Sequence, residues 1–177
     1  ETENEIAYAG LATAQLDLND DQSLRTTFFY TRLTSKSYFE DVGNLPENDV
    51  DIAAGTWWWE ERQLWSGQLV GDHSFERFAD LELDWGVTYA NANRSKPDSR
   101  YYEYTLREDG QYAFQQSQYG NARDWENLND DTWDVFLDGA IPVDVTDYLR
   151  TTFKVGTKYF HKDRNSEHRR FFFQYGF

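Results

Sequence analysis

Residues 79–89 read ADLELDWGVTY, and this stretch decides the fold class. Every second residue from Ala79 to Tyr89 is apolar or aromatic, whereas the residues between them are acidic, small or polar. Because successive side chains of a strand point to opposite faces, this alternation predicts a strand with one apolar and one acidic face. The run of eleven residues is also long enough for a tilted strand to cross a bilayer, which takes about 9–11 residues. Trp85 and Tyr89 are residue types that favour the boundary between membrane and water.

The same alternation recurs along the chain, and no segment shows a sustained helical period. Strands are predicted at residues 5–19, 24–36, 52–70, 79–89, 133–143, 149–161 and 169–177. We therefore expect an all-β fold, an antiparallel up-and-down transmembrane β-barrel segment of about seven strands, with residues 1–177 as a single region. In residues 52–70 the polar run 60–63 interrupts the pattern, so we expect either a strand that rises above the membrane there or a bulge that shifts its register.

Composition limits the classes of protein that remain. The chain has 177 residues and a net charge of -15, which disfavours nucleic acid as a partner. The absence of Cys excludes disulfides, thiolate catalysis and Cys-type zinc sites. No run of about 18 apolar residues exists, so a transmembrane helix is not expected. The 18% of aromatic residues fit the aromatic girdles of a barrel or the large aromatic core of a sandwich. The chain lacks Met and starts without a signal peptide, so we expect it to be processed or part of a longer protein.

Connections of unequal length alternate between the predicted strands. Residues 19–23, 71–74 and 144–147 are short connections, whereas 40–50, 91–131 and 161–168 are longer. Outer-membrane barrels have this arrangement, with short periplasmic turns on one rim and long extracellular loops on the other. We expect residues 91–131 to form a long extracellular loop that carries most of the ligand contacts, with a short hairpin around residues 101–114.

Three runs in order resemble TonB-dependent outer-membrane receptors: residues 69–73 (LVGDH), 81–90 (LELDWGVTYA) and 94–100 (RSKPDSR). In that family a Gly-acid-His turn precedes an "LDW…TYA" strand, which leads into a loop with an "(E/K)PD(T/S)R" signature. Residues 153–159 (FKVGTKY), with 161–164 (HKDR) and 169–171 (RRF), are similar to the next strands of such barrels. The resemblance covers residues 64–177 well and 1–63 loosely.

The resemblance implies energised import through a 22-stranded barrel closed by an N-terminal plug. It implies as partners outer-membrane lipid, the remainder of the barrel, the plug, the TonB complex and an imported siderophore, cobalamin or oligosaccharide. The chain departs from the family by lacking the plug and the TonB box, so we expect a middle portion of the barrel in a bacterial cell outer membrane. Residues 175–177 (YGF) resemble the aromatic C-terminal signal of such barrels, although a cut through an ordinary strand gives the same letters and is the favoured interpretation.

Charged residues at alternate strand positions are predicted to face the barrel lumen. These residues are Asp80, Glu82, Asp84, Asp134, Asp138, Lys154 and Lys158. Acids spaced by two on one strand lie about 7 Å apart, which is too far to share a proton but suits a calcium site with loop oxygens. The favoured interpretation is a polar lumen face that pairs with cations of the plug or of neighbouring strands.

Aromatic residues supply the candidate ligand contacts. The candidates are Tyr101, Tyr102, Tyr104, Tyr112, Trp125 and Trp58, together with Phe114 and Tyr119 of the same predicted loop. They either capture the ligand or pack the loop against itself. The Trp57–Trp59 run is either a platform on which sugars stack or part of an interface girdle. The girdle is favoured, with Trp57 and Trp59 in it and Trp58 facing the lumen.

No signal for catalysis is present. His73, His161 and His168 are scattered without the spacing of metal ligands. Neither a nucleophile elbow nor a glycine-rich phosphate loop occurs. We expect no enzyme, no catalytic residue, no metal and no cofactor. The alternatives to a receptor are a soluble β-sandwich that binds carbohydrate and a passive porin-like barrel.

The alternation also predicts faces and a register. Leu81, Leu83, Trp85, Leu137, Val155 and Phe173 are expected to face lipid. Residues 133–143 and 149–161 should form a hairpin whose paired residue numbers sum to 292, so that Asp138 lies opposite Lys154 and Asp134 opposite Lys158. Opposite charges then pair on one face and apolar groups on the other. A slip by two residues keeps both faces and is the remaining alternative.

Overall fold

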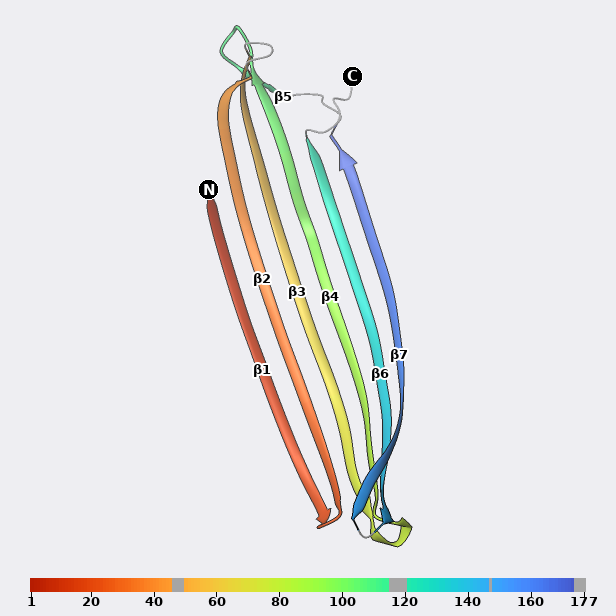
Figure 1. Ribbon diagram of the computed structural model, residues 1–177. Coiled ribbons are helices and arrows are strands. Elements are labelled where there is room, and N and C mark those ends of the chain that lie inside the picture. The colour runs from red at the N-terminus through yellow and green to blue at the C-terminus, as the bar shows by residue number, and fades with distance from the viewer. Residues whose placement is uncertain (46–49, 115–120, 147, 174–177) are drawn as a thin grey trace.

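The computed structural model describes residues 1–45, 50–114, 121–146 and 148–173. Its elements are β1 (Thr2–Asn19), β2 (Gln22–Leu45), β3 (Val50–Phe75), η1 (Glu76–Phe78), β4 (Leu81–Leu106), β5 (Tyr112–Phe114), β6 (Ala122–Thr146) and β7 (Leu149–Phe172). The strands form one antiparallel sheet in the order β1-β2-β3-β4-β6-β7, with β5 paired to β4. Figure 1 shows the long strands β1, β2, β3, β4, β6 and β7 side by side in a single open layer. The all-β antiparallel prediction is confirmed. No helix among the described residues is long and apolar enough to cross a membrane.

The long strands extend well beyond the predicted ones. β4 has 26 residues and is therefore about 85 Å long at about 3.3 Å per residue. The predicted loop at residues 91–131 is wrong, because β4 continues to Leu106 and β6 begins at Ala122. The short hairpin predicted around residues 101–114 is present, and in it Tyr104 pairs with Phe114.

Two other predicted connections are also strand, and so is part of a third. Residues 71–74 belong to β3, residues 161–168 belong to β7, and residues 40–45 of the predicted connection 40–50 belong to β2. As a result, the predicted strands 149–161 and 169–177 are parts of a single strand that ends at Phe172. Residues 174–177 lie outside the described residues. The expected number of seven strands agrees with the structure only because β5 takes the place of the strand lost by this merger.

The connection between β3 and β4 is a tight turn through η1. Ala79 and Asp80 have positive φ angles of 59° and 54°, which places both in the left-handed region. Asp80 therefore precedes β4 and does not share a strand face with Glu82 and Asp84, contrary to the prediction. Asp tolerates this conformation better than most residues, and β4 begins at Leu81, two residues after the predicted start.

The predicted register of the last hairpin is wrong by two residues. Asp138 pairs with Gly156, and Lys154 pairs with Ala140. The Asp138 side chain lies over Gly156, at a position where a Cβ atom on residue 156 would overlap it. Because the slip is by two, the same residues still share each face.

The cross-strand pairs define two faces of the sheet, here named the Trp85 face and the Asp84 face. Trp85 pairs with Leu137, and Leu83 and Val155 both pair with Gly139, so these residues share one face as predicted. Phe173 lies just past the end of β7, where its ring approaches that of Phe114.

A row of aromatic side chains crosses the Trp85 face from β1 to β7. We name it the aromatic row, and its members are Tyr8, Tyr30, Trp65, Tyr89, Trp133 and Tyr159. Tyr89 contacts Trp65 and Trp133 with ring centroids 5.0 and 4.7 Å apart. Tyr8 and Tyr30 lie 5.9 Å apart, and Tyr159 pairs with Val135, which places it diagonally next to Trp133.

The character of the Trp85 face changes at the aromatic row. Between the row and the tight turns the face is apolar, with Leu16, Leu24, Phe28, Leu69, Leu83, Trp85, Val87, Val135, Leu137, Ile141, Phe153 and Val155. We name this area the apolar band. On the other side of the row the same face carries Arg32, Gln63, Asn91, Asn93, Asn129, Asp131 and Asp163.

Within the described residues, the sheet has no hydrophobic core of its own. Among the described residues, Ala122 is the buried apolar side chain, whereas large side chains of the apolar band stay exposed. Leu137 is 45% exposed and Val155 is 78% exposed. Burial of apolar surface is the main force that stabilises folded proteins, so the apolar band needs a cover that the described chain does not supply.

Candidate functional site

A β-bulge in β4 organises the part of the sheet beyond the aromatic row. Ser95 pairs with Glu61 and Asp98 pairs with Trp59, so two residues of β4 lie opposite the single Glu60. Pro97 lies in the bulge, where its missing N–H group costs no ladder hydrogen bond. The bulge inverts the alternation of β4 and turns the odd-numbered residues from Ser99 onward to the Asp84 face.

The structure separates the candidate aromatic residues into two sets. Trp58 and Tyr101 lie on the Asp84 face, whereas Tyr102, Tyr104, Tyr112 and Trp125 lie on the Trp85 face. They therefore do not form one site. Tyr119 lies outside the described residues. The sequence pattern did not reveal this division, because the bulge reverses the faces after residue 97.

The Trp57–Trp59 run lies beyond the apolar band. Trp57 and Trp59 are on the Trp85 face and Trp58 is on the other, as alternation predicted. Trp65, six residues away, is the β3 member of the aromatic row. Trp57, Trp58 and Trp59 are not members of the aromatic row. A cation lies over the ring of each: Arg100 over Trp57 at 4.9 Å, Lys96 over Trp58 at 5.9 Å, and Lys36 over Trp59 at 4.5 Å. The polar run at residues 60–63 also lies beyond the aromatic row. This run is therefore explained by a strand that continues past the apolar band.

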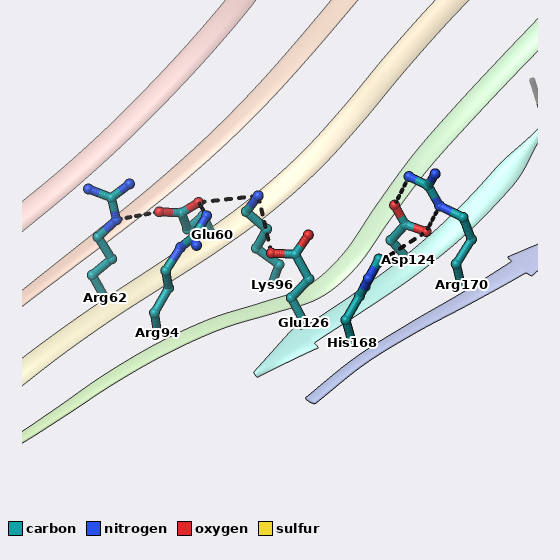
Figure 2. Close-up of polar contacts among 8 residues, drawn as sticks. All are labelled: Glu60, Arg62, Arg94, Lys96, Asp124, Glu126, His168 and Arg170. Carbon is teal, nitrogen blue, oxygen red and sulfur yellow. Dashed lines mark hydrogen bonds and ion pairs between the residues drawn. The ribbon is translucent and has the colours of Figure 1, made fainter. Parts of the chain in front are cut away.

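Glu60 is the centre of an ion-pair network on the Asp84 face. Its carboxylate accepts hydrogen bonds from Arg62 and from Arg94, the latter at 3.0 Å, and lies 3.8 Å from Lys96 Nζ. Lys96 Nζ is also 3.5 Å from Glu126, which links the network to β6 (Figure 2). Burial raises the pKa of Glu60, but the hydrogen bonds from Arg94 and Arg62 outweigh it and hold this pKa below its usual range. The group is therefore an anion that holds three cations together.

A second cluster lies on the same face around Asp124. Arg170 donates two hydrogen bonds of 2.6 Å to the Asp124 carboxylate, and His168 Nε2 lies 3.8 Å from it (Figure 2). This bidentate geometry is the strongest that an arginine and a carboxylate form. Asp124 is only 2% exposed. The Arg170 guanidinium also lies 5.7 Å over the ring of Tyr101.

Ser99 connects the two clusters. It pairs with Trp58 on one side and with Asp124 on the other. Ser99 is 2% exposed, and its Oγ has no hydrogen-bond partner among the described residues. Sequence patterns did not identify Glu60, Ser99, Asp124 or Arg170, because only the bulge and the register bring them together.

A third cluster is nearer to the aromatic row. Arg164 donates two hydrogen bonds of 2.6 Å to Asp130, and Lys162 Nζ lies 3.3 Å from the same carboxylate. The hydrogen bond from Arg164 is the main cause that lowers the pKa of Asp130 to about 2. These ion pairs join β6 to β7 along their length.

The predicted lumen-facing charges, apart from Asp80, share the Asp84 face. Asp134 has a cationic partner, Lys158, at 2.8 Å. Among the described residues Asp84 has no cationic partner, and it lies between Asp72 and Asp138 of the neighbouring strands. No group of three His, Asp or Glu side chains in the described parts of the chain is placed to hold a metal ion.

No protein-family model matches this chain, and no curated protein sequence matches it. The contacts of the chain itself therefore carry the functional argument. The Asp84 face beyond the aromatic row combines exposed aromatic surface, cations and carboxylates, which suits recognition of a polar ligand.

Proposed function

We propose that this chain is a segment of a TonB-dependent receptor in a bacterial outer membrane, where it takes part in ligand capture and energised import. The ligand would be a siderophore, a cobalamin or an oligosaccharide. The observation that carries the membrane location is the apolar band, which is exposed, confined to one face and bounded by the aromatic row. Outer-membrane barrels have an apolar band about 25 Å tall, flanked by aromatic girdles.

The dimensions of the apolar band support this location. Eight residues separate Tyr89 from Leu81, which is about 26 Å along a strand and about 20 Å along the membrane normal at a tilt of about 40°. Twelve residues separate Trp133 from Val145, which is about 40 Å along the strand and about 30 Å along the normal. These two values lie on either side of the thickness expected for such a band.

The ends of the strands support an orientation. The tight turns 20–21 and 76–80 lie at the end of the sheet that adjoins the apolar band, as periplasmic turns do. Beyond the aromatic row both faces carry charged and polar side chains, with aromatic residues such as Trp57, Trp58 and Tyr102 among them, and this part would be extracellular. The Asp84 face would then line the lumen, where the ion-pair network and Trp58 meet the ligand.

The two edge strands of the described sheet, β1 and β7, each have a neighbouring strand on one side only. In the described sheet β1 pairs only with β2, and β7 only with β6. Long edges with unpaired backbone groups are avoided in proteins and are not tolerated in lipid. In the proposed receptor the remainder of the barrel pairs with both edges, and a plug fills the lumen. The import step itself rests on the resemblance in residues 69–100.

Fractionation of cells that make the full-length protein tests the membrane location. We expect the protein in the outer-membrane fraction, resistant to carbonate and salt and released only by detergent. Protease added to intact cells should cut a site inserted at residues 107–111 and leave a site inserted at residues 76–80 uncut. Release without detergent would refute the membrane location and support the soluble β-sandwich.

Import is tested separately in the same cells. Accumulation of the ligand should stop when TonB is deleted and should return when it is restored. Accumulation that does not depend on TonB would refute the receptor and support the passive porin-like barrel.

A further inference from the structure

A cavity of about 380 Å³ opens on the Asp84 face, between β1 and β4, beyond the apolar band. The side chains that matter for its chemistry are Glu3, Glu5, Trp58, Glu60, Arg62, Arg94 and Lys96. Its β1 side has two carboxylates, its β3 and β4 side has three cations around the single carboxylate of Glu60, and Trp58 of β3 adds an aromatic ring. This combination limits the ligands that the cavity accommodates.

The cationic wall has unused hydrogen-bond donors. Arg62 pairs directly with Arg94 across the strands, and together with Lys96 they share the carboxylate of Glu60. Like charges directly opposite each other destabilise a sheet, so this wall gains from a further anion. Arg94 Nε is buried without a hydrogen-bond partner in the described structure. A guanidinium has five N–H donors, so the wall retains several for a ligand.

The opposite wall accepts hydrogen bonds. Glu3 and Glu5 line it from β1, and neither forms an ion pair with the described residues. Two carboxylates without cationic partners attract groups that donate hydrogen bonds, and hydroxyl groups are such donors. They would repel a ligand that is anionic throughout.

Trp58 supplies the aromatic surface of the cavity. Trp58 is 41% exposed, although Lys96 lies over its ring. An exposed indole is a large apolar surface with a flat face, which fits the C–H face of a sugar ring.

We propose that this cavity binds an acidic sugar, namely a uronic-acid unit of an oligosaccharide. The ligand carboxylate accepts hydrogen bonds from Arg62 and Arg94, its ring stacks on Trp58, and its hydroxyl groups donate to Glu3 and Glu5. The inference rests on the proposed receptor function and narrows its ligand to one class.

Calorimetric titration of the full-length protein in detergent micelles tests the inference, with the disaccharide glucuronosyl-β-1,4-glucose, which has one carboxylate, as the probe and neutral cellobiose for comparison. The acidic disaccharide should bind and cellobiose should not. The variant Arg94→Gln should weaken binding about tenfold or more, since a hydrogen bond to a charged group is lost. Trp58→Leu should also weaken binding; it removes the ring over which Lys96 lies but leaves every charged group around Glu60 in place. Arg169→Gln is the matched control, because Arg169 is exposed, pairs with Glu167 on the Trp85 face and lies outside the cavity.

Each outcome is decisive for the cavity. Equal binding of both sugars would overturn the role of charge. Absence of binding, or binding that Trp58→Leu and Arg94→Gln leave unchanged, would overturn the site. Heat-modifiable mobility on gels checks that each variant is folded. The extraction and import experiments report on the receptor itself, so a failure of the cavity is distinguishable from a failure of the proposed function.

Discussion

Leu83→Arg and Glu82→Arg place the same charge on opposite faces of β4 at nearly the same depth. Leu83 is six residues from Tyr89, which is about 20 Å along the strand and about 15 Å below the aromatic row at a tilt of about 40°. In a band about 25 Å tall, Leu83 then lies close to the bilayer midplane. Arginine on the lipid face at the midplane of a barrel costs about 2–4 kcal/mol. Glu82 faces the other side, so its replacement should cost much less.

Unfolding in urea of the full-length protein, reconstituted in lipid vesicles, measures this difference. The expected loss for Leu83→Arg corresponds to about a 30- to 800-fold shift of the folding equilibrium, since each 1.4 kcal/mol is tenfold. Tryptophan fluorescence and heat-modifiable mobility should both report the transition.

The opposite result would refute the assignment of the Trp85 face to lipid. If Leu83→Arg leaves the urea midpoint unchanged while Glu82→Arg lowers it, then the Asp84 face meets lipid. If both variants are harmless, β4 does not cross the bilayer at this level.

Two further predictions test packing and charge. Gly71→Val should cost about 1–3 kcal/mol and shift tryptophan emission, because a Cβ atom at residue 71 would overlap the Trp85 indole. Gly67→Val, on the same face of β3 with open space around it, should be neutral or stabilising in the same unfolding assay. The pKa of Asp130 is lowered to about 2, so its ion pairs stabilise the fold fully above the unfolded value of about 3.9 and lose their effect as the pH falls towards 2. The stability difference between the native protein and Asp130→Asn should therefore be constant between about pH 5 and 7 and shrink between about pH 4 and 2; a difference independent of pH would contradict it.

The hydropathy pattern predicts the strand segments that have one apolar face. It does not predict the segments in which polar residues lie on both faces. The alternation that revealed residues 79–89 depends on different surroundings on the two faces. Beyond Tyr89 the backbone hydrogen bonds of β4 continue, but Asn91 and Asn93 on one face and Ala92 and Arg94 on the other no longer alternate in hydropathy. A long strand with polar residues on both faces has the same sequence pattern as a loop. The pattern therefore predicts a loop at residues 91–131.

The candidate site was less predictable than the fold. The candidate aromatic residues are predicted on one loop, but Tyr101 and Tyr102 are neighbours in a strand and lie on opposite faces, and the bulge at Lys96 and Pro97 decides which face each one takes. A proline within a strand is a signal for a bulge or an edge, so the reversal was detectable in principle. Apart from Arg62, which lies on the same strand as Glu60, the partners of Glu60 and Asp124 come from neighbouring strands, and only the register brings them together.

The register of β6 against β7 shows why charge complementarity alone leaves a sheet ambiguous by two residues. The predicted register required Lys158 directly opposite Asp134. In the structure Asp134 lies opposite Phe160, yet the long side chain of Lys158 reaches it diagonally at 2.8 Å. A lysine therefore satisfies the same aspartate in either register, since diagonal neighbours lie within reach of long side chains. What distinguishes the two registers is shape, because only the observed one places Gly156 opposite Asp138, whose side chain occupies the space that a Cβ atom on residue 156 would fill.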